Sequence, residues 1–330
     1  MVIFIKVFPR KLSPLIACCV LCLTSLPVVS VAQQALGPRA ELLTAPPPYS
    51  FPEKMVPGPD RNLYFLDTTL STTFFMDVKS QSVTRLCGPS GLKLPSDIAI
   101  DRQGAIWILH NGGTKIAKLG RDCSLQGEIA APQLALGIAT NSLGELIVLN
   151  EGGPTLFALL APNGKVIRSF GERIDYKDEV TNNELSNGRI APDNAGGFYF
   201  SFNYPPLIRH YSRTGKLLSE FKPPSDITIG PPNITVRTYT NGVAVSAKYQ
   251  ILVLDMATDG NGRLYLLISG KNKVPALNEG TAKLLILNDK GATLKSLALA
   301  HNFHRLIARN GSLYLLRNRA PFRLDEYAPL

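Results

Sequence analysis

The side chains that could bind a metal ion are few. The chain has four histidines, and His301 and His304 lie three residues apart, a spacing that would let them share an ion on a helix. This segment is expected to lead into a strand. A zinc site also needs a third protein ligand, for which only His110 and His210 remain. We therefore predict neither a metal site nor a cofactor.

Polar side chains lie where apolar runs of the chain begin or end. They are rich in groups that form hydrogen bonds with small polar ligands, and loops that end strands often carry binding sites. The predicted ligand-binding set is His110, Asn111, Asn150, Glu151, Arg189, Asn203, Tyr204, His301, His304, Arg317 and Arg319. The alternative is that these residues only solvate the strand ends. No Gly-x-Ser-x-Gly motif is present, so a serine nucleophile is not indicated.

Arginines are concentrated near the C-terminus. Five of them fall within 19 residues that contain no acid: Arg305, Arg309, Arg317, Arg319 and Arg323. If the fold gathers Arg305, Arg317 and Arg319 near the two C-terminal histidines, the cluster would suit a carboxylate or sulfate ligand. The physical reason is that Arg donates paired hydrogen bonds to oxyanions. The alternative is that these arginines solvate the edges of strands.

The elements that must position these side chains form a repeat. A turn followed by a short apolar strand recurs six times, and the strands begin at Leu63, Ile106, Leu146, Phe198, Leu264 and Leu313. Their spacings of 43, 40, 52, 66 and 49 residues are typical of propeller blades. We predict an all-β fold, a six-bladed β-propeller of four-stranded antiparallel blades, in one domain that spans residues 33–330.

The turns and the strands before them have a consistent composition. Asp or Asn opens most turns because its side chain caps the following amides, and Gly closes them because the chain passes through positive φ. The segment before four of these turns contains an alanine in one register: Ala99, Ala139, Ala191 and Ala257. We expect these segments to be inner strands that converge on the propeller axis, where space is tight. The central strands would end, and the inner strands begin, on one face, called here the top face.

Two features modify the simple repeat. The last blade lacks a fourth strand, and the N-terminal segment Ala40–Thr44 is apolar and unassigned, so we expect it to complete that blade and to close the ring. Residues 171–188 and 222–250 break the period and are expected to form loops over the top face. The second could instead be a degenerate seventh blade, although ~29 residues is short for four strands.

The first 32 residues have the pattern of a signal peptide. Lys6, Arg10 and Lys11 precede an apolar stretch that ends at Ala32, after which we expect cleavage. The alternatives are an uncleaved membrane anchor and a lipoprotein box at Leu15–Cys18. Removal of three cations from 35 basic and 25 acidic residues leaves a net charge of +7. This moderate charge favours anionic partners. The chain has no run of five consecutive basic residues, so nucleic acid is not indicated.

Two cysteines remain after the predicted leader. Cys87 is expected to follow an outer strand on the top face, and Cys123 to lie in an outer turn on the opposite face. A strand of five residues would separate them by ~17 Å, which is beyond the reach of a disulfide. We therefore expect two free thiols, although exported proteins often contain disulfides.

A family resemblance follows from the motif Pro95–Trp107, which reads PSDIAIDRQGAIW. This motif resembles the NHL repeat and the repeats of virginiamycin B lyase, and the likeness covers most of residues 50–327. That lyase family uses a His and Glu pair on its top face, which His110 and Glu151 in neighbouring blades would match. Asn150 with Glu151 also resembles the ligands of calcium-dependent propeller lactonases. The Glu-Gly-Pro opening of the gluconolactonase family is, however, missing from the first blade.

The sequence thus favours a binding or scaffold protein, exported to the periplasm or the cell exterior, rather than an enzyme. We expect a monomer with no membrane span once the leader is removed. Its top face would bind a protein, a peptide or an anionic glycan. The rival interpretation is a propeller lyase or lactonase that uses top-face His and Glu residues, with or without a divalent metal.

Overall fold

The computed structural model describes residues 35–36, 40–45, 53–59, 62–87, 91–239, 242–269, 283–299, 301–309, 311–317 and 322–327. All of them belong to one compact unit that spans Gln34–Leu330. The predicted leader, residues 1–32, lies outside the described residues, as does Arg319. In the part of the chain that is described, no helix is long and apolar enough to cross a membrane.

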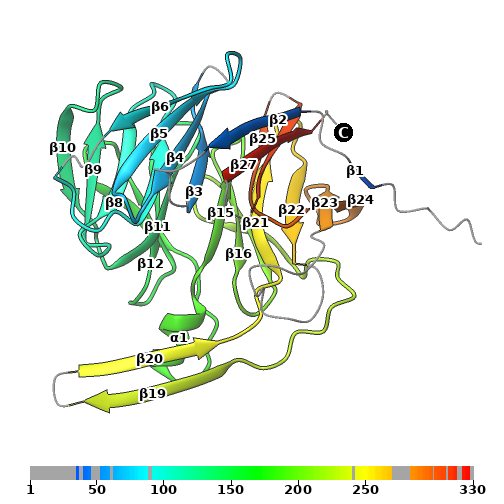
Figure 1. The fold of residues 1–330 in the computed structure, drawn as a ribbon. Coiled ribbons are helices and arrows are strands. Elements are labelled where there is room, and N and C mark those ends of the chain that lie inside the picture. Colours follow the sequence, from blue (N-terminus) through cyan, green and yellow to red (C-terminus); the bar gives the residue numbers. More distant parts are fainter. Residues whose placement is uncertain are drawn as a thin grey trace, which may run out of the picture. The chain divides into compact units, whose positions relative to one another are not determined.

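Six antiparallel sheets form the blades of a propeller, as predicted, and each blade has four antiparallel strands (Figure 1). Blade 1 consists of β3 (Lys54–Pro57), β4 (Leu63–Asp67), β5 (Thr72–Asp77) and β6 (Ser82–Cys87). Blade 2 consists of β7 (Asp97–Ile100), β8 (Ile106–His110), β9 (Lys115–Leu119) and β10 (Leu125–Ala130). Blade 3 consists of β11 (Ala135–Thr140), β12 (Leu146–Asn150), β13 (Phe157–Leu160) and β14 (Val166–Phe170). Blade 4 consists of β15 (Gly188–Pro192), β16 (Phe198–Phe202), β17 (Ile208–Tyr211) and β18 (Leu217–Phe221). Blade 5 consists of β21 (Val253–Thr258), β22 (Leu264–Ile268), β23 (Lys283–Leu287) and β24 (Thr293–Leu299). Blade 6 consists of β25 (Phe303–Arg309), β26 (Ser312–Arg317), β27 (Phe322–Tyr327) and β2 (Ala40–Ala45).

The first strand of each blade is the inner one, and the six inner strands form a ring. Each contacts the inner strand of the next blade, and β25 contacts β3, so the circle returns to its start. A cluster of buried apolar side chains fills each junction between neighbouring blades. Between blades 6 and 1, for example, Leu316 and Leu324 pack with Phe65 and Met76. The blades therefore share their cores, so no blade buries its faces alone.

The turn chemistry predicted from the sequence is confirmed. Oδ1 of the Asp or Asn that opens the turn accepts the backbone N–H groups two and four residues later, as Asp101 does from Gln103 and Ala105 at 3.0 and 2.8 Å. The same pair of bonds forms at Asn141, Asp193 and Asp259. The glycine three residues after the Asp or Asn has positive φ, for example +83° at Gly104, a conformation that glycine adopts without steric cost.

Two insertions interrupt the repeat where an outer strand leads to the next inner strand. Helix α1 (Glu179–Leu185) precedes β15, and the strands β19 (Asn233–Tyr239) and β20 (Gly242–Lys248) precede β21. β19 and β20 pair only with each other among the described strands, so they form a hairpin rather than a seventh blade. Figure 1 shows this hairpin extending away from the blades beside α1.

The N-terminal segment lies along two blades. β2 is antiparallel to β27 and is the outermost strand of blade 6, and β1 (Ala35–Leu36) is parallel to β24 of blade 5. The sequence predicted that this segment completes the last blade. That closure of the ring depends on this strand stays a prediction.

The expectation of two free thiols is wrong. Cys87, at the end of β6, and Cys123, in the turn between β9 and β10, form a disulfide with a Cα–Cα distance of 5.6 Å. The error came from assigning the ends of outer strands to the two faces of the propeller. Adjacent strands of a sheet are rotated by roughly −20 to −25° relative to each other, so the outer strand of a blade is strongly inclined to the propeller axis. The end of the outer strand of blade 1 therefore reaches the outer turn of blade 2.

Candidate site at the mouth of the axial channel

A cavity of about 810 Å³ follows the propeller axis. It is lined by the inner strands of all six blades, including the four alanines that the sequence placed in one register: Ala99, Ala139, Ala191 and Ala257. Small side chains at this register leave the axis open. The volume lies within the ~300–1,000 Å³ range that is usual for small-molecule sites. The channel is therefore the concave feature around which we build the site.

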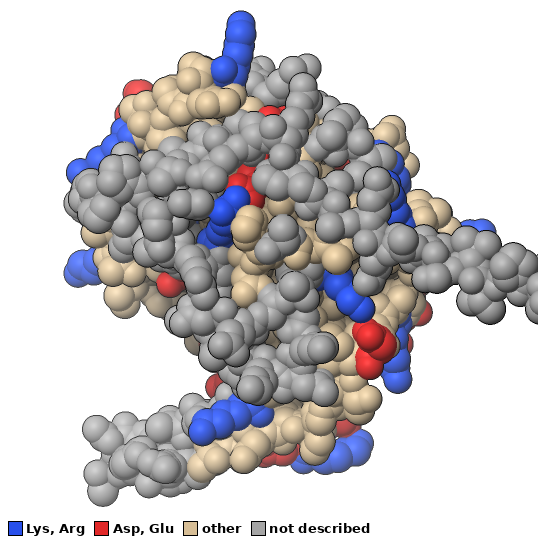
Figure 2. Space-filling model, turned by 45° about the vertical axis from the view of Figure 1, so that its right-hand side comes forward, with Lys and Arg blue, Asp and Glu red and all other residues tan. Residues whose placement is uncertain are grey.

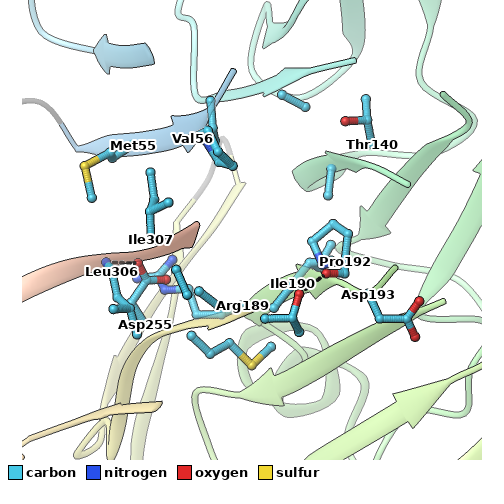
Figure 3. A pocket seen from close by; sticks show the side chains of 18 of the residues that line it. Met55, Val56, Thr140, Arg189, Ile190, Pro192, Asp193, Asp255, Leu306 and Ile307 are labelled. Carbon is cyan, nitrogen blue, oxygen red and sulfur yellow. Dashed lines mark hydrogen bonds between the residues drawn. The ribbon is translucent and has the colours of Figure 1, made fainter. Parts of the chain in front are cut away.

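One register position of the inner strands carries most of the charge in this channel. It lies two residues before the alanine position and is occupied, from blade 1 to blade 6, by Lys54, Asp97, Gly137, Arg189, Asp255 and Arg305. We call these residues the mouth ring, because they begin the inner strands at the top face. The ring contains three cations and two carboxylates, which gives a surplus of one positive charge. Figure 3 shows two of its members, Arg189 and Asp255, near each other in the cavity.

Backbone bulges precede the mouth ring in three blades. The pairing register with the central strand shifts just before Gly137, Asp255 and Arg305. A bulge inserts one residue and re-aims the side chains that follow it. In blades 5 and 6 it precedes the charged residue at the start of the inner strand.

The two carboxylates of the ring bind the backbone of the next blade. Oδ2 of Asp97 accepts the N–H of Ile138 at 2.9 Å. Oδ2 of Asp255 accepts the N–H of Leu306 at 2.8 Å, and Figure 3 shows these two residues. In both cases the donor is the residue that follows the ring position of the neighbouring blade. The two acids therefore stabilise equivalent junctions, between blades 2 and 3 and between blades 5 and 6.

The cations of the ring reach in the same rotational direction. Nε of Arg189 donates to the carbonyl of Leu254 at 3.2 Å, and Nε of Arg305 donates to the carbonyl of Glu53 at 2.5 Å. Both acceptors precede the ring position of the next blade. Nζ of Lys54 lies 3.2 Å from Oδ1 of Asp97. Five of the six junctions are thus bridged by a ring side chain. The exception is the junction between blades 3 and 4, where the ring residue is glycine.

Burial perturbs the charges of the ring. It raises the pKa of Asp255, although Arg305 and Arg189 oppose the shift. It lowers the pKa of Arg305 to about 10, and the neighbouring Arg189 adds to this shift. It also lowers the pKa of Lys54 against the effect of Asp97. Lys54 and Arg305 are therefore poorly hydrated, and the charge of Arg189 disfavours the charged form of both, which is the situation that an anionic ligand relieves.

Arg189 has donors to spare. Arg189 lines the channel, and among the described residues its only hydrogen bond is the one from Nε, so neither terminal nitrogen has a protein acceptor there. Arg305 uses Nε and Nη1, the latter for the carbonyl of His304 at 2.8 Å. A guanidinium group binds a carboxylate or sulfate through two parallel N–H groups. The ring can therefore accept an oxyanion without losing the bonds that join the blades.

Toward the other end of the channel, threonines join neighbouring inner strands. Oγ1 of Thr140 donates to the carbonyl of Ile100 at 2.7 Å, and Oγ1 of Thr258 donates to the carbonyl of Pro192 at 2.5 Å. Both threonines lie three residues after the ring position and reach back to the preceding blade. These bonds use neutral groups, whereas each charged residue of the mouth ring contacts the next blade through its charged group. Figure 2 shows cationic and anionic side chains next to each other near the middle of the face that it presents.

Of the predicted site residues, Arg189 alone belongs to the mouth ring. His110 is buried, and its Nε2 lies 3.0 Å from Oε2 of Glu128 on the outer strand of its own blade. Its partner is therefore not Glu151, which the resemblance to the lyase family implied. Burial lowers the pKa of His110, and Glu128 opposes that shift. Asn111 is exposed and donates to Thr114 at 2.8 Å.

A second predicted group comes together beside α1. The carbonyl of Asn150 accepts a hydrogen bond from Arg173 at 2.9 Å, and Glu151 is close enough to oppose the lowering of the Arg173 pKa that burial causes. Asn203 is buried, and the ring of Tyr204 lies 6.5 Å from that of Tyr176 and 6.1 Å from that of Tyr249. The sequence had singled out Asn150, Glu151, Asn203 and Tyr204, but not their three neighbours.

One arginine of the predicted C-terminal cluster is paired with an acid. Arg317 makes a two-pronged contact with Asp325, at 2.8 and 2.9 Å, and Asp325 is fully buried. Asp325 lies two residues after Arg323, just outside the acid-free stretch that contains the five arginines. His301 is exposed and His304 is half-buried in β25. Arg319 lies outside the described residues, so its place in the predicted cluster is untested.

Sequence reasoning missed Lys54, Asp97 and Asp255. The available signal was their position two residues before the alanine register, which becomes visible only when all six inner strands are aligned. The described residues contain no group of three His, Cys, Asp or Glu side chains placed to hold a metal ion. The prediction that the protein has no metal site stays a prediction.

No family model and no curated protein sequence matches the chain. Solved structures do. The chain is similar to a streptogramin B lyase, with a TM-score of 0.52, 15% sequence identity and coverage of 83% of this chain and 78% of that one. It is also similar to a catalytically inactive virginiamycin B lyase from Staphylococcus aureus with quinupristin, with a TM-score of 0.53, 13% identity and coverage of 84% and 80%.

A gluconolactonase from Xanthomonas campestris is similar as well, with a TM-score of 0.50, 13% identity and coverage of 82% of each chain. At such low identity these likenesses show the fold alone. The resemblance to virginiamycin B lyase that the motif at residues 95–107 suggested is confirmed at the level of the fold. The NHL repeat itself stays a prediction of the sequence.

Proposed function

We propose that this chain is an exported binding propeller that captures an anionic group at the top-face mouth of its axial channel. The observation that carries the proposal is the mouth ring, where Lys54, Arg189 and Arg305 outnumber two carboxylates. Both carboxylates are engaged with the backbone of the next blade, whereas Arg189 keeps its terminal N–H groups for a ligand. A carboxylate or sulfate group on a peptide, glycan or protein fits this site.

Catalysis is less well supported. A lyase of the kind that the sequence resemblance implied would need a histidine and an acid that face the same ligand. His110 instead contacts Glu128 on the outer strand of blade 2, away from the inner strands that line the channel. No other observation of the site favours a lyase or a lactonase over a binding protein.

Export is part of the proposal, and two observations support it. The first 32 residues have the composition of a signal peptide, with a basic start and an apolar stretch. The mature chain contains the Cys87–Cys123 disulfide, and disulfides persist mainly in oxidising compartments such as the periplasm or the cell exterior.

The test is sulfate binding to the purified mature chain, measured by calorimetry at low ionic strength. Arg189→Met removes the guanidinium that has free donors and should weaken sulfate binding by about tenfold or more, since a hydrogen bond to a charged group contributes about 1.5–3 kcal/mol. Arg168→Met, on the exposed outer strand of blade 3, is the matched control and should bind as the wild type does. Equal affinities for all three proteins, or no saturable sulfate binding, would overturn the proposal.

A further inference from the structure

Three half-exposed tyrosines lie next to the mouth ring on the top face. Tyr176 precedes α1, Tyr204 follows β16 and Tyr249 follows β20, and their rings form a row with centroid distances of 6.5 and 6.1 Å. We call these residues the tyrosine row. Half-exposed aromatic rings offer flat apolar faces with a polar tip, a combination that suits ligands with both apolar and polar sides.

Four buried polar atoms around this row lack a hydrogen-bond partner among the described residues. Among the described residues, Oδ1 of Asn150, Nη1 of Arg173, the hydroxyl of Tyr176 and Oδ1 of Asn203 have no hydrogen-bond partner. Asn150 and Asn203 are only 1% and 6% exposed. An unpaired buried polar group costs about 1–3 kcal/mol, so four of them in one region call for a polar occupant.

The contacts show that these atoms belong to one region. Three bonds tie Arg173 to the loop after β12: from Nε to the carbonyl of Gly153 at 2.8 Å, and from Nη2 to the carbonyls of Gly152 at 2.6 Å and Asn150 at 2.9 Å. At the other end, burial raises the pKa of Tyr249, and a hydrogen bond with Asn203 opposes this shift. The row therefore runs from the loop of blade 3 to the start of blade 5.

The chemistry of the unpaired atoms narrows the class of ligand. Two of them are acceptors, one is a donor and the Tyr176 hydroxyl can be either. Two carboxyl groups lie nearby: Glu184 on α1, and Glu151, whose charge adds to the effect of burial in raising the pKa of Glu184. A hydroxyl group both donates and accepts, so a ligand with many hydroxyls can satisfy all of these atoms at once.

The row and the mouth ring are adjacent. The N–H of Asn203, next to Tyr204, donates to the carbonyl of Asn187 at 2.9 Å, and Asn187 lines the channel together with Arg189. The guanidinium charge of Arg189 also acts to lower the pKa of Tyr249, against the larger effect of burial. We infer that the top face binds an acidic oligosaccharide: its acidic group lies at the mouth ring, and its hydroxyls and ring faces lie along the tyrosine row. The mouth-ring half of this inference rests on the proposed function, whereas the tyrosine-row half rests on separate residues.

The experiment uses the mature chain and a panel of oligogalacturonate, hyaluronan and chondroitin sulfate fragments, with sulfate as the simple anion. At least one fragment should bind more tightly than sulfate by about tenfold or more, because the tyrosine row adds contacts that sulfate cannot make. Tyr249→Ala should remove that advantage and leave sulfate binding unchanged. Tyr249→Phe, which keeps the ring, should retain most of it. Leu218→Ala, on the exposed outer strand of blade 4, is the control for surface truncation.

The outcomes separate the two proposals. If sulfate binds through Arg189 but no fragment of the panel binds more tightly, the oligosaccharide inference is wrong and the anion site stands. If a fragment binds and Tyr249→Ala has no effect, the tyrosine row is not the subsite, and water fills the region around the unpaired atoms. If neutral fragments prepared by methyl esterification of oligogalacturonate bind through Tyr249 while Arg189→Met changes nothing, the row stands and the anion site fails. Urea unfolding of each variant confirms that it folds.

Discussion

At the scale of the residue, the mouth ring shows how one position of a repeat can serve both structure and binding. The same register place holds Lys, Asp, Gly, Arg, Asp and Arg in the six blades, and each charged side chain reaches the next blade. Buried charges are tolerated when each is paired or bonded to the backbone. After these contacts between blades are made, the ring still has one surplus positive charge and the unused donors of Arg189, which are available to bind a ligand.

The raised pKa of Asp255 gives a pH dependence with a definite sign. Below its folded pKa, which lies above the ordinary 3.8, Asp255 becomes neutral and the ring charge rises from +1 to +2. Sulfate binding should therefore tighten as the pH falls, by about tenfold for one unit charge a few Å away in partly solvated surroundings. Asp255→Asn should bind sulfate more tightly at neutral pH and should lose the pH dependence.

Glu184→Gln is the control for this titration, because the pKa of Glu184 is also raised by burial but its side chain lies on α1 rather than in the ring. This variant should keep the pH dependence of sulfate binding. If Asp255→Asn titrates like the wild type, the acid that governs the mouth is a different one.

At the scale of the element, the junction between blades 1 and 2 is held by the disulfide. Cys87 is 3% exposed and packs with Ile98, Ile106 and Leu119 in the cluster that the two blades share. The bond closes a loop with a sequence separation of 36 residues. In the chain-entropy account such a crosslink stabilises the folded state by about 3–4 kcal/mol.

The double variant Cys87→Ser, Cys123→Ser should lose about 3–4 kcal/mol of unfolding free energy, measured by urea denaturation. The fluorescence of Trp107, the only tryptophan of the chain and 1% exposed, reports the unfolding of blade 2. The wild type in reducing agent should approach the variant. If reduction leaves the wild-type midpoint unchanged, the two thiols are not joined in solution.

At the scale of the whole molecule, the ring has its ends in blade 6. Three strands of this blade come from the C-terminus, and β2 pairs with β27 from the N-terminal side. A propeller without its closing strand exposes unpaired edges, which invite aggregation. Deletion of residues 33–45 should therefore lower the unfolding free energy by at least about 3 kcal/mol, or on the order of 5 °C in Tm.

Deletion of residues 33–34 alone, which leaves β1 and β2 intact, should have no effect on Tm. A chain without residues 33–45 that melts like the wild type and stays monomeric would show that the ring does not depend on β2. Size-exclusion chromatography of both deletions separates a loss of stability from aggregation through the exposed edge of β27.

The sequence alone determined the propeller, because its signals are local. Turn residues at fixed offsets, each followed by a short apolar run, predicted where the central strands begin. Five of these predicted starts agree with the structure: Leu63, Ile106, Leu146, Phe198 and Leu264. The alanine register correctly placed the channel lining.

Tertiary structure alone decided which side chains are partners. Asp97 binds Ile138, Asp255 binds Leu306, Arg317 binds Asp325 and Cys87 joins Cys123, because the twist of each blade and the rotation between blades determine which distant side chains meet. The spacing of residues along the chain does not determine this rotation. The sequence therefore identified side chains that could bind a ligand, but not which of them meet in the mouth ring.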